Sequence, residues 1–265
     1  MLNTITRKTI YEKRWTVVAW AFGLFSMTFF TMIFYPYLKN SGFDQVIANV
    51  PKSLQNLLGD SSNYKTVVGY VDQQIFAMRL PLMSIIMTIT IFVGIGVGDE
   101  DRGTLETLLA LPIARTKVFW QKFAAGAALT GLASIGIFFG VIASFPLIHG
   151  SMSYLNVAEA TFGCWLVSLA FGALAYALGA GTGKRGLTIG LTSGVAFVSY
   201  MISSLAPAVD KLSFAQKFTP FYYYNVPGIA QHGLKFSNLA VLVGSMLLLL
   251  LVSLVFFRNR DLVRD

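Results

Sequence analysis

Residues 236–257 read FSNLAVLVGSMLLLLLVSLVFF, an unbroken stretch without Asp, Glu, Lys or Arg. About 20 apolar residues, rising 1.5 Å each in a helix, cross the roughly 30 Å hydrocarbon core of a bilayer. Backbone groups in hydrocarbon have no water to bond, so a single stretch that crosses the core has to be helical. The stretch therefore predicts a transmembrane helix.

Five other stretches are free of charged residues and long enough to span a bilayer: Trp15–Leu38, Leu80–Gly98, Phe123–Ala158, Ala160–Gly183 and Gly186–Val209. The composition agrees, because 55% of the residues are hydrophobic, 12% are charged and the mean hydropathy is +0.65. A soluble chain carries about 25% charged residues. The sequence predicts an all-α membrane protein with six transmembrane helices, in a single domain over residues 1–265.

The basic residues are distributed unevenly between the two sides of the predicted bundle. The side with both termini carries 13 of the 20 Lys and Arg residues, the other side carries 6, and Arg79 lies near a boundary. Short loops rich in Lys and Arg stay in the cytoplasm. We therefore expect a multi-pass protein of the cell membrane with both termini cytoplasmic. The net charge of +8 is spread over many loops, so it predicts no nucleic-acid partner.

Several segments outside the spans have a helical or aromatic pattern. Residues 3–14 predict an amphipathic helix at the inner surface, and residues 43–50 repeat apolar side chains at helical spacing on the outer side. The outer segment 210–235 contains the run Phe221–Tyr224. It is either an aromatic belt at the lipid boundary or a re-entrant element that closes the outer end of a transport path.

The inner segment between the second and third spans is the most informative. Residues 98–117 read GDEDRGTLETLLALPIARTK. A short helix over Thr104–Leu111 places three leucines on one face, and Pro112 ends it. This apolar face either packs on the chain's own spans or docks a soluble partner.

The segment resembles the cytoplasmic signature of type-2 ABC exporter permeases. The resemblance rests on Glu100, Gly103, Thr104, Leu105, Glu106, Leu108, Leu109, Pro112 and Arg115. The outer stretches 51–70 and 219–224 are similar to the multidrug or polyketide-antibiotic exporter subgroup. The resemblance implies a coupling helix that sits in a cleft of a separate ABC ATPase subunit. It also implies that ATP and Mg²⁺ bind in that partner, in an assembly of two membrane subunits and two ATPase subunits.

The chain shows no energy source of its own, so we expect it not to be an enzyme. Residues 179–185 read GAGTGKR, but Leu178 and Arg185 stand where a phosphate loop needs Gly and Ser or Thr. We expect this stretch to be a hinge between spans. His149, His232 and Cys164 form no metal-ligand cluster, so we expect no metal or cofactor. We expect Arg79, near an outer span end, to snorkel toward water or to pair locally, for example with Asp72, rather than to bind substrate.

Gly186, Gly190 and Gly194 form a small-residue stripe at four-residue spacing. Such a stripe lets two helices approach closely. It is either a contact within the chain or part of the seam with a second permease copy or a related permease.

Two functions fit these patterns. The first is a permease subunit that exports an amphipathic or apolar compound, driven by a partner ATPase. The alternative is a non-transporting membrane scaffold or immunity protein that binds a partner through the same surfaces.

Overall fold

The structure is a computed structural model that describes residues 3–41, 65–98, 114–207, 209, 211–224 and 228–259. All regular elements within these ranges are helices. The long helices are α1 (Asn3–Ile33), α6 (Leu80–Gly96), α9 (Arg115–Ile148), α10 (Tyr154–Thr182), α11 (Arg185–Leu205) and α15 (Phe236–Asn259). The short ones are α2 (Tyr35–Asn40), α5 (Val67–Tyr70), the π-helix η2 (Val71–Arg79), α12 (Leu212–Gln216), α13 (Pro220–Tyr224) and α14 (Ile229–His232).

Six helical segments are long and apolar enough to cross a membrane, which confirms the predicted number of spans. They are Thr6–Lys39, Val67–Gly96, Arg115–Ile148, Tyr154–Thr182, Arg185–Leu205 and Phe236–Phe257. The all-α prediction is confirmed as well. The expected outer helix at 43–50 and the short inner helix at 104–111 lie outside the described residues.

The second and third spans begin earlier in the sequence than predicted. The second starts at Val67 rather than Leu80, because α5 and η2 run directly into α6. The third starts at Arg115 rather than Phe123. The predicted spans begin after the last charged residue, and this rule places both starts too late. A transmembrane helix can include charged residues that have protein partners or that lie near the water boundary.

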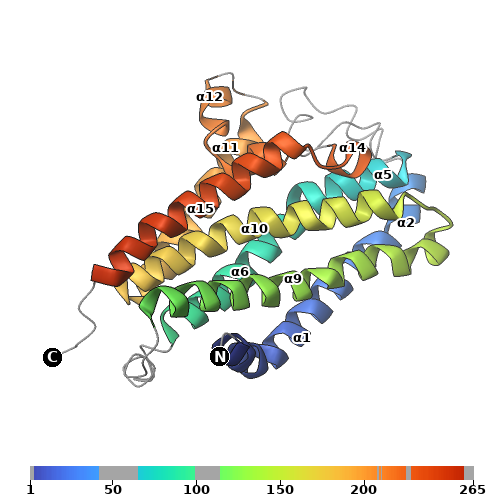
Figure 1. The fold of residues 1–265 in the computed structure, drawn as a ribbon. Coiled ribbons are helices and arrows are strands. Elements are labelled where there is room, and N and C mark those ends of the chain that lie inside the picture. Colours follow the sequence, from blue (N-terminus) through green and yellow to red (C-terminus); the bar gives the residue numbers. More distant parts are fainter. Residues whose placement is uncertain are drawn as a thin grey trace.

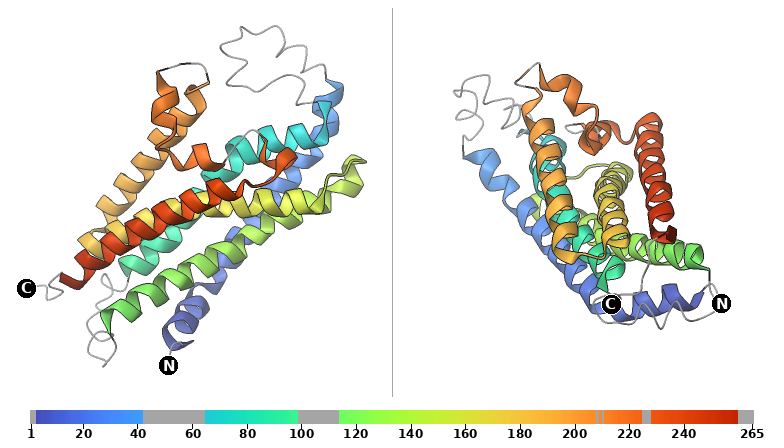
Figure 2. Two further views of the ribbon diagram at one scale, coloured as in Figure 1. Left: turned by 45° about the horizontal axis from the view of Figure 1, so that its top comes forward. Right: turned by 90° about the vertical axis from the view of Figure 1, so that its left-hand side faces the viewer.

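Both ends of the chain lie at the same end of the bundle, as an even number of spans predicts. Figure 1 shows the start of α1 and the end of α15 there. We call this the terminal end, and the opposite end, where α2, α5, α12 and α14 lie, the distal end. Figure 2 shows the first turns of α1 lying across the terminal end before the helix continues along the bundle. The expected N-terminal amphipathic segment is thus the first part of one long helix.

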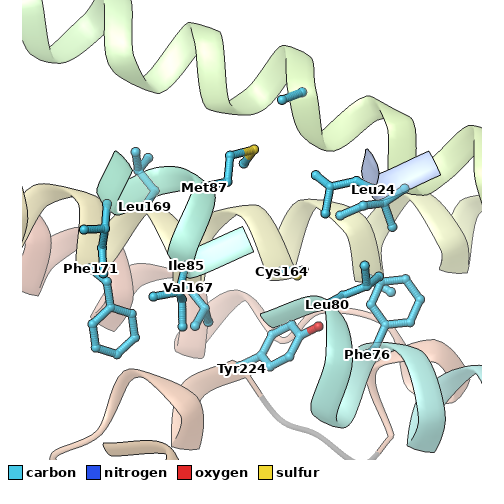
Figure 3. Close-up of a cluster of buried hydrophobic side chains, with 14 of the residues drawn as sticks. Leu24, Phe76, Leu80, Ile85, Met87, Cys164, Val167, Leu169, Phe171 and Tyr224 are labelled. Carbon is cyan, nitrogen blue, oxygen red and sulfur yellow. The ribbon is translucent and has the colours of Figure 1, made fainter. Parts of the chain in front are cut away.

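Helix α10 is the centre of the bundle and packs against α6, α9, α11 and α15. The most apolar 18-residue stretch of α10 is 67% buried, whereas the corresponding stretches in the spans of α1, α11 and α15 are each only 22% buried. Figure 3 shows part of this core, where Val167 of α10 lies close to Ile85 of α6. The three peripheral helices turn large apolar side chains outward, and these side chains suit contact with lipid.

Helix α1 lies along α9 at a distance that only glycine permits. A Cβ atom added at Gly140 would be 2.7 Å from the carbonyl oxygen of Phe25, and one at Gly136 would overlap the backbone of Ala21. The absence of side chains at these two positions lets the helix backbones approach closely. The contact fixes α1 to the second half of α9.

Candidate functional site at the two ends of the bundle

Most of the predicted coupling residues lie outside the described part of the chain. These are Glu100, Gly103, Thr104, Leu105, Glu106, Leu108, Leu109 and Pro112. Arg115 is described, and it is the first residue of α9. The structure therefore shows the two helices that flank the coupling segment, namely the end of α6 and the start of α9.

A cluster of aromatic side chains joins these flanking helices to α10 and α15. Its members, which we call the terminal aromatic cluster, are Phe92, Phe119, Phe123, Tyr176 and Phe257. The ring centroids are 4.9 Å apart for Phe119 and Tyr176 and 5.3 Å apart for Phe92 and Phe123. The buried Tyr176 hydroxyl donates a hydrogen bond to the Phe119 carbonyl oxygen at 2.9 Å. Rings at these separations pack favourably, so the four helices are held together at the terminal end.

Phe92 of α6 is the most tightly enclosed member of the cluster. A Cβ atom added at Gly126 of α9 or at Gly172 of α10 would lie 2.6 Å from the Phe92 ring. Phe92 therefore occupies space that two glycines on two other helices leave open. Because closely packed interiors transmit displacement, a movement of α6 at this level has to carry α9 and α10 with it.

At the distal end, a buried carboxylate holds the segment that follows α13. Asp72 of η2 is 2% exposed, and it accepts hydrogen bonds from the backbone N–H groups of Gly228 and Ala230, the latter at 3.1 Å. Arg79 makes a local contact, as expected, but its partner is not Asp72. The Arg79 guanidinium instead donates to the Gln74 carbonyl oxygen at 3.2 Å, because the Asp72 carboxylate turns inward toward α14.

Two side chains of α10 hold the same segment from the other side. The Asn156 amide donates to the Ala230 carbonyl oxygen at 3.0 Å, and Glu159 accepts from the Leu234 N–H at 3.0 Å. Gly233 lies at φ +70°, and a Cβ atom there would overlap the Glu159 carboxylate. We call Asp72, Asn156 and Glu159 the distal clamp. Sequence patterns missed it, because its partners are backbone groups of residues 228–234.

The predicted aromatic segment at 210–235 divides into two parts. Phe214 and Phe218 are 68% and 77% exposed, as side chains of an aromatic belt would be. Phe221 and Tyr224 of α13 are instead buried in the bundle, as a re-entrant element requires.

Tyr224 carries a hydroxyl group into the bundle interior. Figure 3 shows its ring reaching into the cluster that contains Leu80 and Cys164. Its hydroxyl has no hydrogen-bond partner among the described residues. Burial raises the pKa of Tyr224 well above its ordinary value, so the group is neutral at physiological pH.

The glycine stripe of α11 makes no contact within the described chain. A Cβ atom added at Gly186, Gly190 or Gly194 would have no atom within 4 Å. The helix packs through another face, whose buried residues are Thr188, Thr192, Ala196 and Ser199. Among the described residues, the stripe therefore lies on an open surface and makes no intrachain contact.

The glycine-rich stretch before α11 is a turn between two spans. Gly183 ends α10 at φ +62°, and its N–H donates to the Gly179 carbonyl oxygen at 2.9 Å. Lys184 is extended, and α11 starts at Arg185. The stretch predicted to be a hinge is thus the connection between the fourth and fifth spans.

Comparison with protein families matches residues 4–262 to the family described as ABC-2 family transporter protein. No curated protein matches the chain. The match covers nearly all of the six spans and the segments between them. Membership implies an ABC ATPase as the partner of this multi-pass membrane protein. The chain belongs to the ABC-2 family of transporter proteins and is a permease subunit of an ABC transporter.

Proposed function

We propose that this permease exports an amphipathic or apolar compound across the cell membrane, with both termini in the cytoplasm. The family match over residues 4–262 is the observation that supports a transport function. The orientation is supported by the 13 basic residues on the side of the termini, against 6 on the other side. The similarity of the outer stretches to multidrug or polyketide-antibiotic exporters supports outward movement of such a compound.

The energy for transport comes from the partner. ATP and Mg²⁺ bind in the ATPase subunit, and this chain hydrolyses no nucleotide. The stretch 179–185 supports this proposal, since it departs from the phosphate-loop pattern at two positions and contains the turn between α10 and α11.

The partner's movement enters through the segment at 99–113 and passes into α6 and α9. The leucines Leu105, Leu108 and Leu109 provide the apolar face that docks in the ATPase cleft. The terminal aromatic cluster then makes α6, α9 and α10 move together, because Phe92 is enclosed by all three helices.

The distal clamp closes the other end of the path until α6 and α10, moving together, pull away from residues 228–234. Asp72 belongs to η2, which continues into α6, while Asn156 and Glu159 belong to α10. Both helices hold the backbone of residues 228–234. A joint movement of the two helices away from this segment therefore breaks these hydrogen bonds and opens the distal end.

A second permease subunit completes the transport path. The open glycine stripe of α11 is the proposed seam, since small residues let the helices of two subunits pack closely. The partner is a second copy of this chain or a related permease.

Co-purification of the ATPase tests the proposed coupling. The variant Leu105→Asp with Leu108→Asp places two charges on the docking face, and we expect the ATPase to be lost from the purified complex. The matched control is Thr107→Asp with Ala110→Asp, which adds the same charge on the other face of the predicted helix and should retain the partner. Equal retention of the ATPase by both variants would refute the docking role.

A transport assay separates the exporter from the alternative scaffold or immunity protein. Sealed vesicles that contain the purified assembly should move a lipophilic dye such as ethidium only when ATP is supplied. Stable partner binding without ATP-dependent movement of dye or of extracted native compounds would favour the alternative.

A further inference from the structure

A pocket of about 350 Å³ opens between α9 and α10, which run side by side (Figure 1). Each helix contributes four lining residues at the spacing i, i+3, i+4 and i+7, beginning at Gly131 of α9 and at Ala158 of α10. Residues at this spacing share one face of a helix. The volume lies within the range of small-molecule sites, so the pocket is large enough for a ligand.

The pocket is open toward the bilayer. Helix α1 packs against Gly136 and Gly140, which lie on the opposite face of α9 from the pocket. Two of the lining residues, Ile135 and Phe162, are 45% and 44% exposed. Both α9 and α10 are membrane spans. Within the described part of the chain, a molecule dissolved in the bilayer can therefore reach this pocket from the side.

Aromatic rings from both helices form much of the wall. Phe138 belongs to α9, and Phe162 and Trp165 belong to α10. The ring centroids of Phe162 and Trp165 are 5.4 Å apart, and the indole N–H donates to the Thr130 hydroxyl at 3.1 Å. The indole is thus held in place, and it presents a flat surface on which another ring packs favourably. Such a wall favours a rigid ring system over a flexible acyl chain, which loses more conformational freedom on binding.

Thr161 adds a hydrogen-bonding group to this wall. Its side chain is 8% exposed, and its hydroxyl has no hydrogen-bond partner among the described residues. Ser134, which also lines the pocket, instead donates to the Thr130 carbonyl oxygen at 2.9 Å. A buried hydroxyl without a partner is costly. Because a threonine in a helix has two accessible χ1 rotamers, this hydroxyl can turn to meet a polar group of a ligand.

We propose that this pocket binds a neutral, ring-bearing amphipathic molecule with one hydroxyl or carbonyl group. The rings of the ligand pack against Trp165 and Phe162, and its polar group bonds the Thr161 hydroxyl. The ligand is neutral because the lining residues carry no charge and an unpaired charge at membrane depth is costly. Binding is a property of the lone chain, so it requires neither the ATPase nor transport.

A pair of probes tests the proposal, with the full chain in phosphatidylcholine nanodiscs. The probes are 1-hydroxypyrene and 1-methylpyrene, which have the same ring system and differ in the hydroxyl group. Trp15, Trp20 and Trp120 are replaced by Phe, so that energy transfer from Trp165 reports binding at the pocket. One neutral hydrogen bond is worth about fivefold in affinity. We therefore expect saturable quenching by both probes, with 1-hydroxypyrene bound about fivefold more tightly.

Thr161→Val should abolish this preference and leave the affinity for 1-methylpyrene unchanged. The substitution keeps the shape of the side chain and removes an unpartnered hydroxyl, so the fold is retained. The matched control is Thr90→Val, because the Thr90 hydroxyl bonds the Ile86 carbonyl oxygen of its own helix. This control should keep the fivefold preference.

A second variant, Ala158→Leu, fills the pocket from an exposed position and should abolish saturable binding of both probes. Its matched control is Ala124→Leu, at an exposed position of α9 that does not line the pocket, and this variant should bind both probes normally. Equal thermal unfolding of the two variants checks that both fold.

Four results would overturn the proposal. Quenching that rises without saturation would show only partition of the probes into the bilayer, and equal affinity for the two probes would show that Thr161 bonds no ligand. An equal loss of binding in Ala158→Leu and Ala124→Leu would place the probes elsewhere. Loss of probe binding when the chain dimerises would assign the pocket to the seam between permease subunits.

Discussion

The distal clamp yields the sharpest prediction, through the substitution Asp72→Asn. The carboxylate is 2% exposed and accepts hydrogen bonds from two backbone N–H groups, those of Gly228 and Ala230. An asparagine offers one oxygen and turns an NH₂ group toward a second donor. One N–H is then left without an acceptor in a buried site, which costs about 2 kcal/mol.

This loss acts on the closed state of the distal segment, so the open population should rise about 30-fold. The assay follows the labelling rate of a cysteine reporter by a membrane-impermeant maleimide. Ala230→Cys places the reporter at a fully buried position, and Cys164→Ser leaves it as the sole thiol. We expect labelling about 30-fold faster in the Asp72→Asn background.

The matched control is Arg79→Gln, because Arg79 lies on the same π-helix and, among the described residues, donates a hydrogen bond to the neighbouring Gln74 carbonyl oxygen. Its labelling rate should equal that of the unmodified chain. Equal rates with Asp72→Asn and with the control would show that the clamp does not hold the segment, and the reasoning would be refuted.

Three further substitutions test the packing. Phe92→Ala should lower the free energy of unfolding by about 3 kcal/mol, measured by thermal unfolding in detergent, and should leave ATP hydrolysis by the complex poorly coupled to dye movement. Gly140→Val should separate α1 from α9, because its Cβ atom would be 2.7 Å from the Phe25 carbonyl oxygen; reduced thermal stability checks this, and an unchanged transition contradicts it. A Cβ atom added at Gly190 has no described atom within 4 Å, so Gly190→Leu should fold normally yet abolish the permease dimer in native gel electrophoresis.

The number and order of the spans follow from the sequence, because a helix in hydrocarbon has to be long, apolar and free of unpaired charge. The same criterion explains the errors at span ends. Asp72 interrupts the apolar pattern but is bonded to backbone groups far along the chain, and no local pattern reveals such a partner. The second span therefore extends further than its uncharged part.

The site is less predictable than the fold. Phe92, Phe119 and Tyr176 have ordinary sequence neighbours, and only packing brings their rings together. The glycine stripe of α11 is the opposite case, because it has a clear sequence pattern. Its spacing predicts a surface for close helix approach, but spacing alone does not say which helix packs there, and no part of the described chain does.

The central claim is that this chain catalyses no reaction itself and that ATP hydrolysis in a partner ATPase drives its movements. The most direct measurement compares ATP hydrolysis by the assembly purified from native membranes with hydrolysis by the lone chain, both in sealed vesicles. We predict that the assembly hydrolyses ATP and that the lone chain does not. ATP hydrolysis by the lone chain, or uphill ethidium movement by it without any nucleotide, would contradict the account.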